Sequence, residues 1–193
     1  MHHFFIFFIT IVFLAGCAQS PPQPSTIELQ GNQTPPPKQW EITAKLGIKV
    51  PTQSGSVSLT WQQLDTSYRI RVQGPLGQGS GIIYGNAERV VIKRPGKPLL
   101  SSSDATGLIR ETFGWDFPLH DLKFWIRGIP TPNAEITSEK QTPTGLLENL
   151  QQAQWSMEYS RYKKVDEWLL PGKIVAQQGE TRLTMIIRKW AIL

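Results

Sequence analysis

Residues 56–63, SVSLTWQQ, alternate polar and apolar side chains from Ser56 to Gln62. In an extended chain Val57, Leu59 and Trp61 lie on one side, and serine and threonine lie on the other. Successive side chains of a β-strand point to opposite faces, so this period of two is typical of a strand with one buried face. The segment therefore predicts an antiparallel sheet that is apolar on one side and polar on the other.

The same alternation recurs in three further segments, SYRIRVQG at 67–74, WSMEYSRY at 155–162 and TRLTMIIRKW at 181–190. Residues 81–96, GIIYGNAERVVIKRPG, have the pattern of a hairpin that turns at Gly85 and Asn86. A sheet with one apolar face must close on itself or be covered by other elements. We therefore expect one curved antiparallel sheet that covers most of the chain.

Helical patterns cluster in the middle of the sequence. SSSDATGLIRETFG at 101–114 offers Ser and Asp as N-caps and ends at Gly114, and PLHDLKFWIRG at 118–128 begins with Pro118 and ends at Gly128. A third short helix is expected over GLLENLQQ at 145–152. About three short helices are thus available to cover the sheet.

The first residues of the chain differ from the rest. Residues 4–16 form an apolar run of 13 residues, which is shorter than the ~20 residues that a membrane-spanning helix needs but suits a signal peptide. The stretch Leu14-Ala15-Gly16-Cys17 resembles the bacterial lipobox, whose cysteine receives a diacylglycerol before cleavage in front of it. We expect residues 1–16 to be a signal peptide and Cys17 to carry a lipid. The alternative is an ordinary secretory signal with an incidental cysteine.

Residues 17–37 have the composition of a tether. Six prolines lie among Gln, Ser and Thr between Ala18 and Pro37, which favours an extended chain of up to ~3.1 Å per residue. The lipidated cysteine is followed by Ala18 and Gln19 rather than by aspartate, which resembles the pattern of lipoproteins sorted to the outer membrane. Residues 38–193 are expected to form a single folded domain.

Residues for catalysis or metal binding are scarce. Cys17 is the only cysteine, and His120 is the only histidine beyond the signal peptide, so neither a histidine pair nor a cysteine cluster can form. No serine lies in a Gly-x-Ser-x-Gly motif, and the Gly-rich stretch 74–81 lacks the Lys-Ser or Lys-Thr pair of a phosphate loop. The 20 basic and 15 acidic residues are scattered, which argues against a nucleic-acid partner. The sequence therefore predicts neither an enzyme nor a cofactor.

The chain is rich in tryptophan, with seven residues. Several of them fall on the apolar faces of predicted strands and helices, in excess of what a small core requires. A half-open barrel leaves an apolar pocket inside. We predict such a pocket, lined partly by Trp61, Ile70, Trp125, Trp155 and Met185.

Longer blocks carry a resemblance to a known family. They are WQQ at 61–63, YRIRVQGPLG at 68–77, ETFGWDFPLHDLKFWIRGIP at 111–130, WSMEY at 155–159 and LTMIIRKW at 183–190. In their order and spacing, from about Trp40 to Trp190, they resemble the LolB family, and residues 118–130 are the most specific block. Gly74 departs from the polar residue expected before Pro75. The resemblance implies a half-open antiparallel β-barrel, lidded by about three short helices, around a hydrophobic cavity.

The resemblance also implies a function. Members of the family are outer-membrane lipoproteins that accept lipoproteins from a periplasmic carrier, LolA, and insert them into the outer membrane. The implied partners are a LolA-like carrier, the acylated cargo and the outer membrane, with the protein a monomer anchored by its lipid and facing the periplasm. Pro75, Leu76 and Gly77 match the family's membrane-delivery loop, in which the leucine protrudes.

Two other functions stay open at this point. A lipoprotein hydrolase would need a nucleophile and a base, and His120 would have to matter. A structural accessory of envelope assembly would bind protein partners through a basic face of the sheet.

Overall fold

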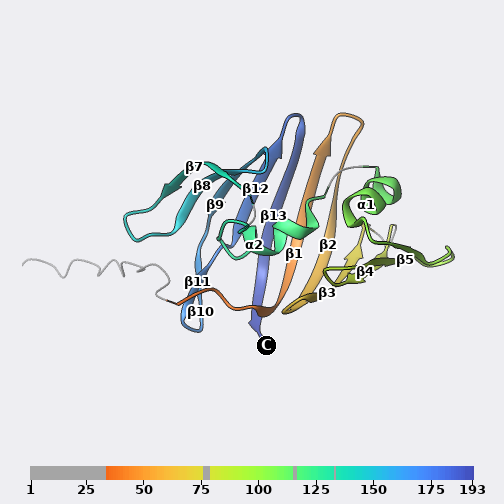
Figure 1. Cartoon of the computed structure of the whole chain (residues 1–193), viewed down its shortest axis with the longest axis horizontal. Helices are drawn as coiled ribbons and strands as arrows, with labels where there is room; N and C mark the ends of the chain where they lie inside the picture. Colours follow the sequence, from red (N-terminus) through yellow and green to blue (C-terminus); the bar gives the residue numbers. More distant parts are fainter. Residues whose placement is uncertain (1–33, 76–78, 115–116, 133) are drawn as a thin grey trace, which may run out of the picture.

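A computed structural model describes residues 34–75, 79–114, 117–132 and 134–193 of the chain. Its main feature is an antiparallel sheet of 11 strands in the order β6-β5-β4-β3-β2-β1-β13-β12-β9-β8-β7, beside a two-stranded sheet of β10 and β11 (Figure 1). The strands are β1 (Gln39–Val50), β2 (Gln53–Leu64), β3 (Ser67–Gln73), β4 (Gly81–Gly85), β5 (Val90–Lys93), β6 (Leu100–Ser102), β7 (Ile136–Gln141), β8 (Leu147–Gln152), β9 (Trp155–Ser160), β10 (Lys163–Val165), β11 (Trp168–Leu170), β12 (Lys173–Gln178) and β13 (Thr181–Ile192). The helices are α1 (Ala105–Phe113) and α2 (Leu119–Trp125). No helix in the described part of the chain is long and apolar enough to cross a membrane.

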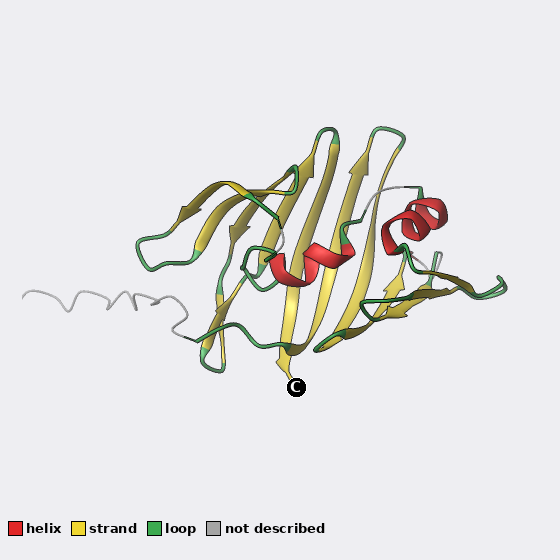
Figure 2. Cartoon of the chain, viewed as in Figure 1, coloured by secondary structure: helices red, strands yellow, loops and turns green. Residues whose placement is uncertain are grey.

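The sheet is curved and open. Its edge strands, β6 and β7, lie at opposite ends of the strand order and do not pair with each other. Both helices lie in front of the same face of the sheet, with α2 over its middle strands and α1 toward the end that carries β4 and β5 (Figure 2). The predicted half-open antiparallel barrel with a helical lid is confirmed.

The concave face of the sheet, which the helices cover, forms the core. One row of directly paired residues crosses six strands from β13 to β5, and all its members are buried. They are Trp190, Ile42, Trp61, Ile70, Ile83 and Ile92. Burying each such side chain contributes about 1.5–3 kcal/mol. The alternation of polar and apolar residues in segment 56–63 therefore has its physical origin in this row and its neighbours.

The two predicted helices that the structure contains are bounded as expected. The Asp104 side chain accepts a 2.9 Å hydrogen bond from the backbone N–H of Gly107 and so caps α1. Gly114, with φ of 80°, ends α1 by donating its N–H to the carbonyl of Arg110 at 2.8 Å. Helix α2 follows Pro118, and the chain leaves the helical path at Gly128, whose φ is 73°.

The predicted third helix over residues 145–152 is wrong, because this segment forms β8 between β7 and β9. Leu147 and Leu150 are three residues apart, which imitates a helix. A β-bulge explains the spacing, since Gln141 pairs with Leu147 and Lys140 with Asn149, so that Glu148 is the extra residue. Pairing with two neighbouring strands outweighs the helix propensity of Leu, Glu and Gln.

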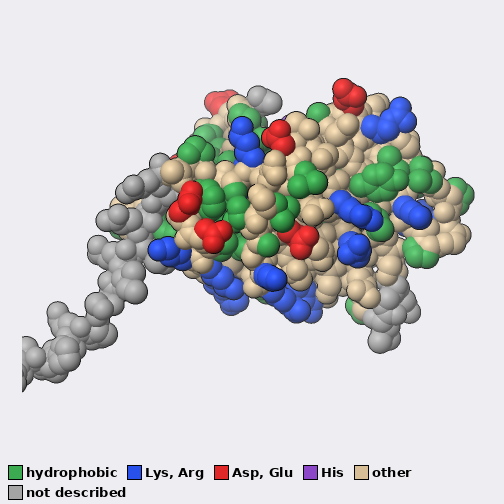
Figure 3. All heavy atoms as spheres, turned by 90° about the horizontal axis from the view of Figure 1, so that it is seen from below, with side chains coloured by type: hydrophobic (Ala, Val, Ile, Leu, Met, Phe, Trp, Pro, Cys, Tyr) green, Lys and Arg blue, Asp and Glu red, His purple; other side chains and the backbone are tan. Residues whose placement is uncertain are grey.

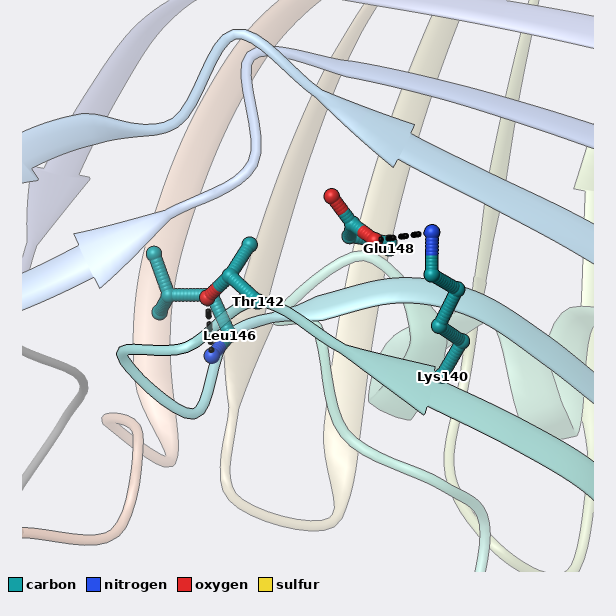
Figure 4. Close-up of polar contacts among 4 residues, drawn as sticks. All are labelled: Lys140, Thr142, Leu146 and Glu148. Carbon is teal, nitrogen blue, oxygen red and sulfur yellow. Dashed lines mark hydrogen bonds and ion pairs between the residues drawn. The ribbon is translucent and has the colours of Figure 1, made fainter.

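Local contacts hold the β7–β8 hairpin together (Figure 4). The Thr142 hydroxyl accepts a 3.0 Å hydrogen bond from the backbone N–H of Leu146. Lys140 Nζ lies 2.8 Å from Glu148 Oε2 across the two strands. These contacts stabilise the turn and the pairing of β7 with β8.

Candidate apolar binding cavity

A cavity of about 380 Å³ lies between the concave face of the sheet and helix α1. Its size falls within the usual range for small-molecule sites. The walls come from β1 to β4, from α1, from Phe117 before α2 and from the connection that follows β3. None of the described residues that line it carries a charge. The cavity is therefore suited to an apolar ligand.

The cavity has a buried floor and a partly exposed rim. Leu59, Ile70, Ile83 and Ile109 form the floor and are each at most 5% exposed. The rim consists of half-buried apolar side chains, Ile48, Val57, Val72 and Phe113. A ligand with a long apolar chain would cover the rim as well as the floor and so remove both from water.

Gly55 keeps one side of this rim open. It lies in β2 directly opposite Ile48 of β1, on the concave face. A Cβ atom built on Gly55 would meet no atom within 4 Å. The missing side chain therefore leaves free space at the cavity rim, and a larger residue would project into it.

A polar contact links the end of helix α1 to the start of strand β2. The Gln53 side-chain amide donates a 3.3 Å hydrogen bond to the carbonyl of Phe113, and this contact is exposed to solvent. Because water competes for an exposed hydrogen bond, the contact stabilises the closed arrangement only weakly.

The connection after β3 borders the cavity. Strand β3 ends at Gln73, before Pro75, because proline has a fixed φ and no N–H to donate to the neighbouring strand. Gly74, Pro75 and Gly79 line the cavity, and Pro75 is exposed. Leu76 and Gly77 lie outside the described residues, so the roles predicted for these two residues and for Pro75 in membrane delivery stay predictions.

The five residues expected to line the pocket occupy different places. Ile70 lines the apolar cavity. Met185 is buried in β13 opposite Leu46 of β1. Trp61, Trp125 and Trp155 are also buried but do not belong to the lining of this cavity. A part in acyl binding for these last four residues stays a prediction.

The buried tryptophans pack against one another instead. The ring of Trp40 lies 5.6 Å from that of Trp61 and 5.5 Å from that of Trp190, and the rings of Trp125 and Trp155 lie 6.3 Å apart. Such aromatic pairs contribute about 0.5–1.5 kcal/mol beyond their burial. The lining that sequence reasoning missed consists mainly of smaller residues of β1, β2 and α1, several of which lie on the alternating apolar faces.

His120 lies at a second, polar pocket of about 220 Å³, where α2 meets the start of α1. It is exposed, and none of its ring nitrogens bonds a hydroxyl or carboxylate of the described residues. Burial raises the pKa of the neighbouring Tyr68 to about 12. Burial, followed by the charge of Arg127, lowers the pKa of Lys123 against the opposing effect of Asp121 and Asp65. The nucleophile and base that a hydrolase needs are not paired at this pocket.

The open curved sheet, the helical cover and the uncharged cavity define a known class of half-open barrels. A LolA superfamily protein from Nitrosomonas europaea shares the fold with a TM-score of 0.53, over 82% of this chain and 87% of that chain at 5% identity. A domain from Vibrio parahaemolyticus, described provisionally as an outer membrane lipoprotein-sorting protein, gives a TM-score of 0.56, over 80% of this chain and 85% of that chain at 8% identity. At these identities the likeness concerns the fold alone.

Sequence comparison gives the family. The family model described as outer membrane lipoprotein LolB matches residues 38–190. The outer-membrane lipoprotein LolB of Cellvibrio japonicus is 37% identical over 190 residues, which cover 95% of this chain and 94% of that protein. The LolB of a Pseudomonas fluorescens strain is 31% identical, over 96% of this chain and 94% of that protein. The chain belongs to the LolB family of outer membrane lipoproteins.

Proposed function

We propose that this protein is a receptor that takes lipoproteins from a LolA-like periplasmic carrier and passes them into the outer membrane. The uncharged cavity between the sheet and α1 is the observation that carries the proposal. Membership of the LolB family supports it, as does the fold shared with a LolA superfamily protein. In this account the acyl chains of the cargo occupy the cavity after they leave the carrier and before they enter the membrane.

The energetics favour a transfer between cavities. Each CH₂ group of an acyl chain costs about 0.8 kcal/mol in water, so a long chain exposed during transfer would cost on the order of 10 kcal/mol. A receiving cavity that opens beside the carrier's own cavity avoids this cost. The transfer requires no bond to be made or broken, and the direction follows from a more favourable site in the receiver.

Anchoring by Cys17 would hold the domain at the inner leaflet of the outer membrane, facing the periplasm. Cys17 lies outside the described residues. The end of the proline-rich segment lies on the domain, because Trp168 Nε1 donates to the carbonyl of Pro35 at 2.9 Å and Arg127 Nη1 donates to that of Pro37 at 3.1 Å. These contacts fix the point from which the tether of a monomeric receptor would extend.

We propose a receptor rather than an enzyme, and His120 distinguishes the two. His120→Ala should leave lipoprotein acceptance unchanged, since the exposed imidazole does not belong to the lining of the apolar cavity. A hydrolase would lose its activity in this variant.

Calorimetry with palmitate tests the cavity. The chain from residue 17, with Cys17→Ser, should bind palmitate with a negative heat-capacity change, because apolar surface is removed from water. Absence of any binding heat across a saturating titration would contradict the proposal.

A further inference from the structure

The convex face of the sheet is strongly basic. Along β12, β13 and β1 to β5, nine Lys or Arg side chains point away from the helices, against a single acidic one, Glu41. In a view from below, several Lys and Arg side chains gather along the lower margin of the molecule, while the acidic ones lie nearer its middle and at its upper margin (Figure 3). The basic face is defined by Lys45, Lys49, Arg69, Arg71, Lys93, Lys173, Arg182, Arg188 and Lys189.

A β-bulge adds to this charge. The pairing of β1 with β13 shifts between Thr43 and Ala44, so that Arg188 is the extra residue and both Arg188 and Lys189 are exposed. Regular alternation would have turned one of the two cations toward the core. The strand thus departs from regular pairing at a point where the departure increases the basic character of this face.

Exposed or half-buried apolar side chains lie between the cations. Ile186, which is 37% exposed, pairs directly with Lys45 on one side and Lys173 on the other. Ile82 pairs in the same way with Arg71 and Lys93. An apolar residue flanked by two long basic side chains fits the boundary between lipid headgroups and acyl chains, because the cations reach phosphates while the apolar group enters below them.

A hollow of about 340 Å³ lies on this face at the ends of β3, β4 and β5. Arg71 and Lys93 line it, and since both pair directly with Ile82, one on each side, about two strand spacings, or 10 Å, separate their backbones. Neither cation forms an ion pair with a carboxylate of the described residues. The hollow therefore presents two uncompensated positive charges to one anionic group.

The hollow is next to the cavity rim. Val72 lines both the hollow on the convex face and the apolar cavity on the concave face. Gln73 and Ser80 of the hollow flank the connection that borders the cavity through Gly74, Pro75 and Gly79. A membrane surface bound at the hollow would therefore lie next to the cavity opening.

We propose that the basic face docks on anionic phospholipid headgroups, with one phosphate in the hollow between Arg71 and Lys93, and so holds the cavity rim against the bilayer. This inference rests on the proposed function, which brings the protein to a membrane. A membrane surface fits better than an acidic protein because the charges are spread over five of the seven strands from β12 to β5 and alternate with exposed or half-buried apolar residues.

Vesicle flotation tests the docking. The chain from residue 17, with Cys17→Ser, is mixed with vesicles of phosphatidylcholine alone or with phosphatidylglycerol added. Each basic residue at an anionic surface contributes about a fivefold increase in partition. In the double variant Arg71→Gln with Lys93→Gln, the partition coefficient to the anionic vesicles should therefore fall at least about tenfold. The matched control, Lys163→Gln with Lys164→Gln, removes the same charge from exposed positions of the β10–β11 hairpin and should stay within about twofold of the parent.

Three results would overturn the inference. Partition that does not depend on phosphatidylglycerol excludes headgroup binding. Equal losses in both double variants would mean that net charge alone acts. Normal vesicle partition of the Arg71 and Lys93 variant with loss of carrier binding would assign the face to a protein. Palmitate binding, measured on the same samples, separates this test from that of the proposed function, because the cavity lies on the other side of the sheet.

Discussion

The indole Nε1 of Trp125 donates a 3.1 Å hydrogen bond to the side-chain oxygen of Gln152 and so joins helix α2 to strand β8. The same oxygen accepts from the backbone N–H of Thr131, and the amide nitrogen donates to the carbonyls of Thr131 and Ala134, each at 2.8 Å. Gln152 is 1% exposed, so water cannot replace these partners. Helix α2 is thus a fixed part of the core, while the Gln53 contact that links α1 to the sheet is exposed.

Replacing the buried amide should destabilise the fold. Gln152→Leu leaves the Trp125 and Thr131 donors buried without acceptors, which costs about 3 kcal/mol in the free energy of unfolding. Urea denaturation measures the change. Gln151→Leu, at the exposed neighbouring position of β8, is the control and should change the stability by less than about 0.5 kcal/mol. Equal effects of the two substitutions would show that the amide network does not hold α2.

Filling the cavity rim should block ligand binding without unfolding the protein. In Gly55→Leu the new side chain enters the free space opposite Ile48, and affinity for palmitate should fall about tenfold or more. Calorimetry gives the affinity, and thermal unfolding shows whether the fold is retained. Ser58→Leu adds the same side chain to the opposite, exposed face of β2 and should bind palmitate as the parent does. Unchanged affinity in Gly55→Leu would place the acyl site elsewhere.

Leu76→Glu should separate acceptance from delivery. Exposing a leucine to water costs roughly 1.5–3 kcal/mol relative to burial, a cost that contact with the bilayer would remove. The variant should stay folded and accept lipoprotein from the carrier, yet release little to liposomes. Gln78→Glu puts the same charge two residues away in the same connection and should deliver far more than Leu76→Glu. Unfolding of Leu76→Glu would mean that Leu76 is a core residue, and normal delivery would exclude its membrane role.

Cys17→Ser should release the protein from the outer membrane. Without a thiol no diacylglycerol can be attached, and the two-chain anchor that holds a lipoprotein stably in a bilayer is lost. Cells fed labelled palmitate and then fractionated should show label on the parent protein in the outer membrane and no label on the variant. Label that persists in Cys17→Ser would mean that the lipid is attached elsewhere.

The sheet could be predicted from sequence because its apolar residues meet one another across strands. Trp61 pairs with Ile42 on one side and Ile70 on the other, so each strand shows the same alternation by itself. The capping residues Asp104 and Gly114 likewise act within a few positions of the chain. The segment at 145–152 misled because a bulge at Glu148 gave a strand the spacing of a helix.

The cavity was harder to predict because it depends on where the curved sheet leaves space. Period and composition show which faces are apolar, but they do not distinguish apolar residues that fill the core, such as tryptophans, from the smaller aliphatic residues that line a cavity. The tryptophans fill the sheet interior by packing on one another, as Trp40 does on Trp61 at 5.6 Å. The rim depends on an absent side chain at Gly55 and on a contact between Gln53 and Phe113, 60 residues apart, which no local pattern reveals.

Transfer of a radiolabelled lipoprotein from purified carrier to the chain beginning at residue 17, with Cys17→Ser, tests the central claim most directly. The account predicts that the label moves from the carrier to this protein without nucleotide, and that Gly55→Leu reduces the transfer while Ser58→Leu does not. Label that stays on the carrier when the folded parent protein is in excess would contradict the claim that this protein receives lipoproteins.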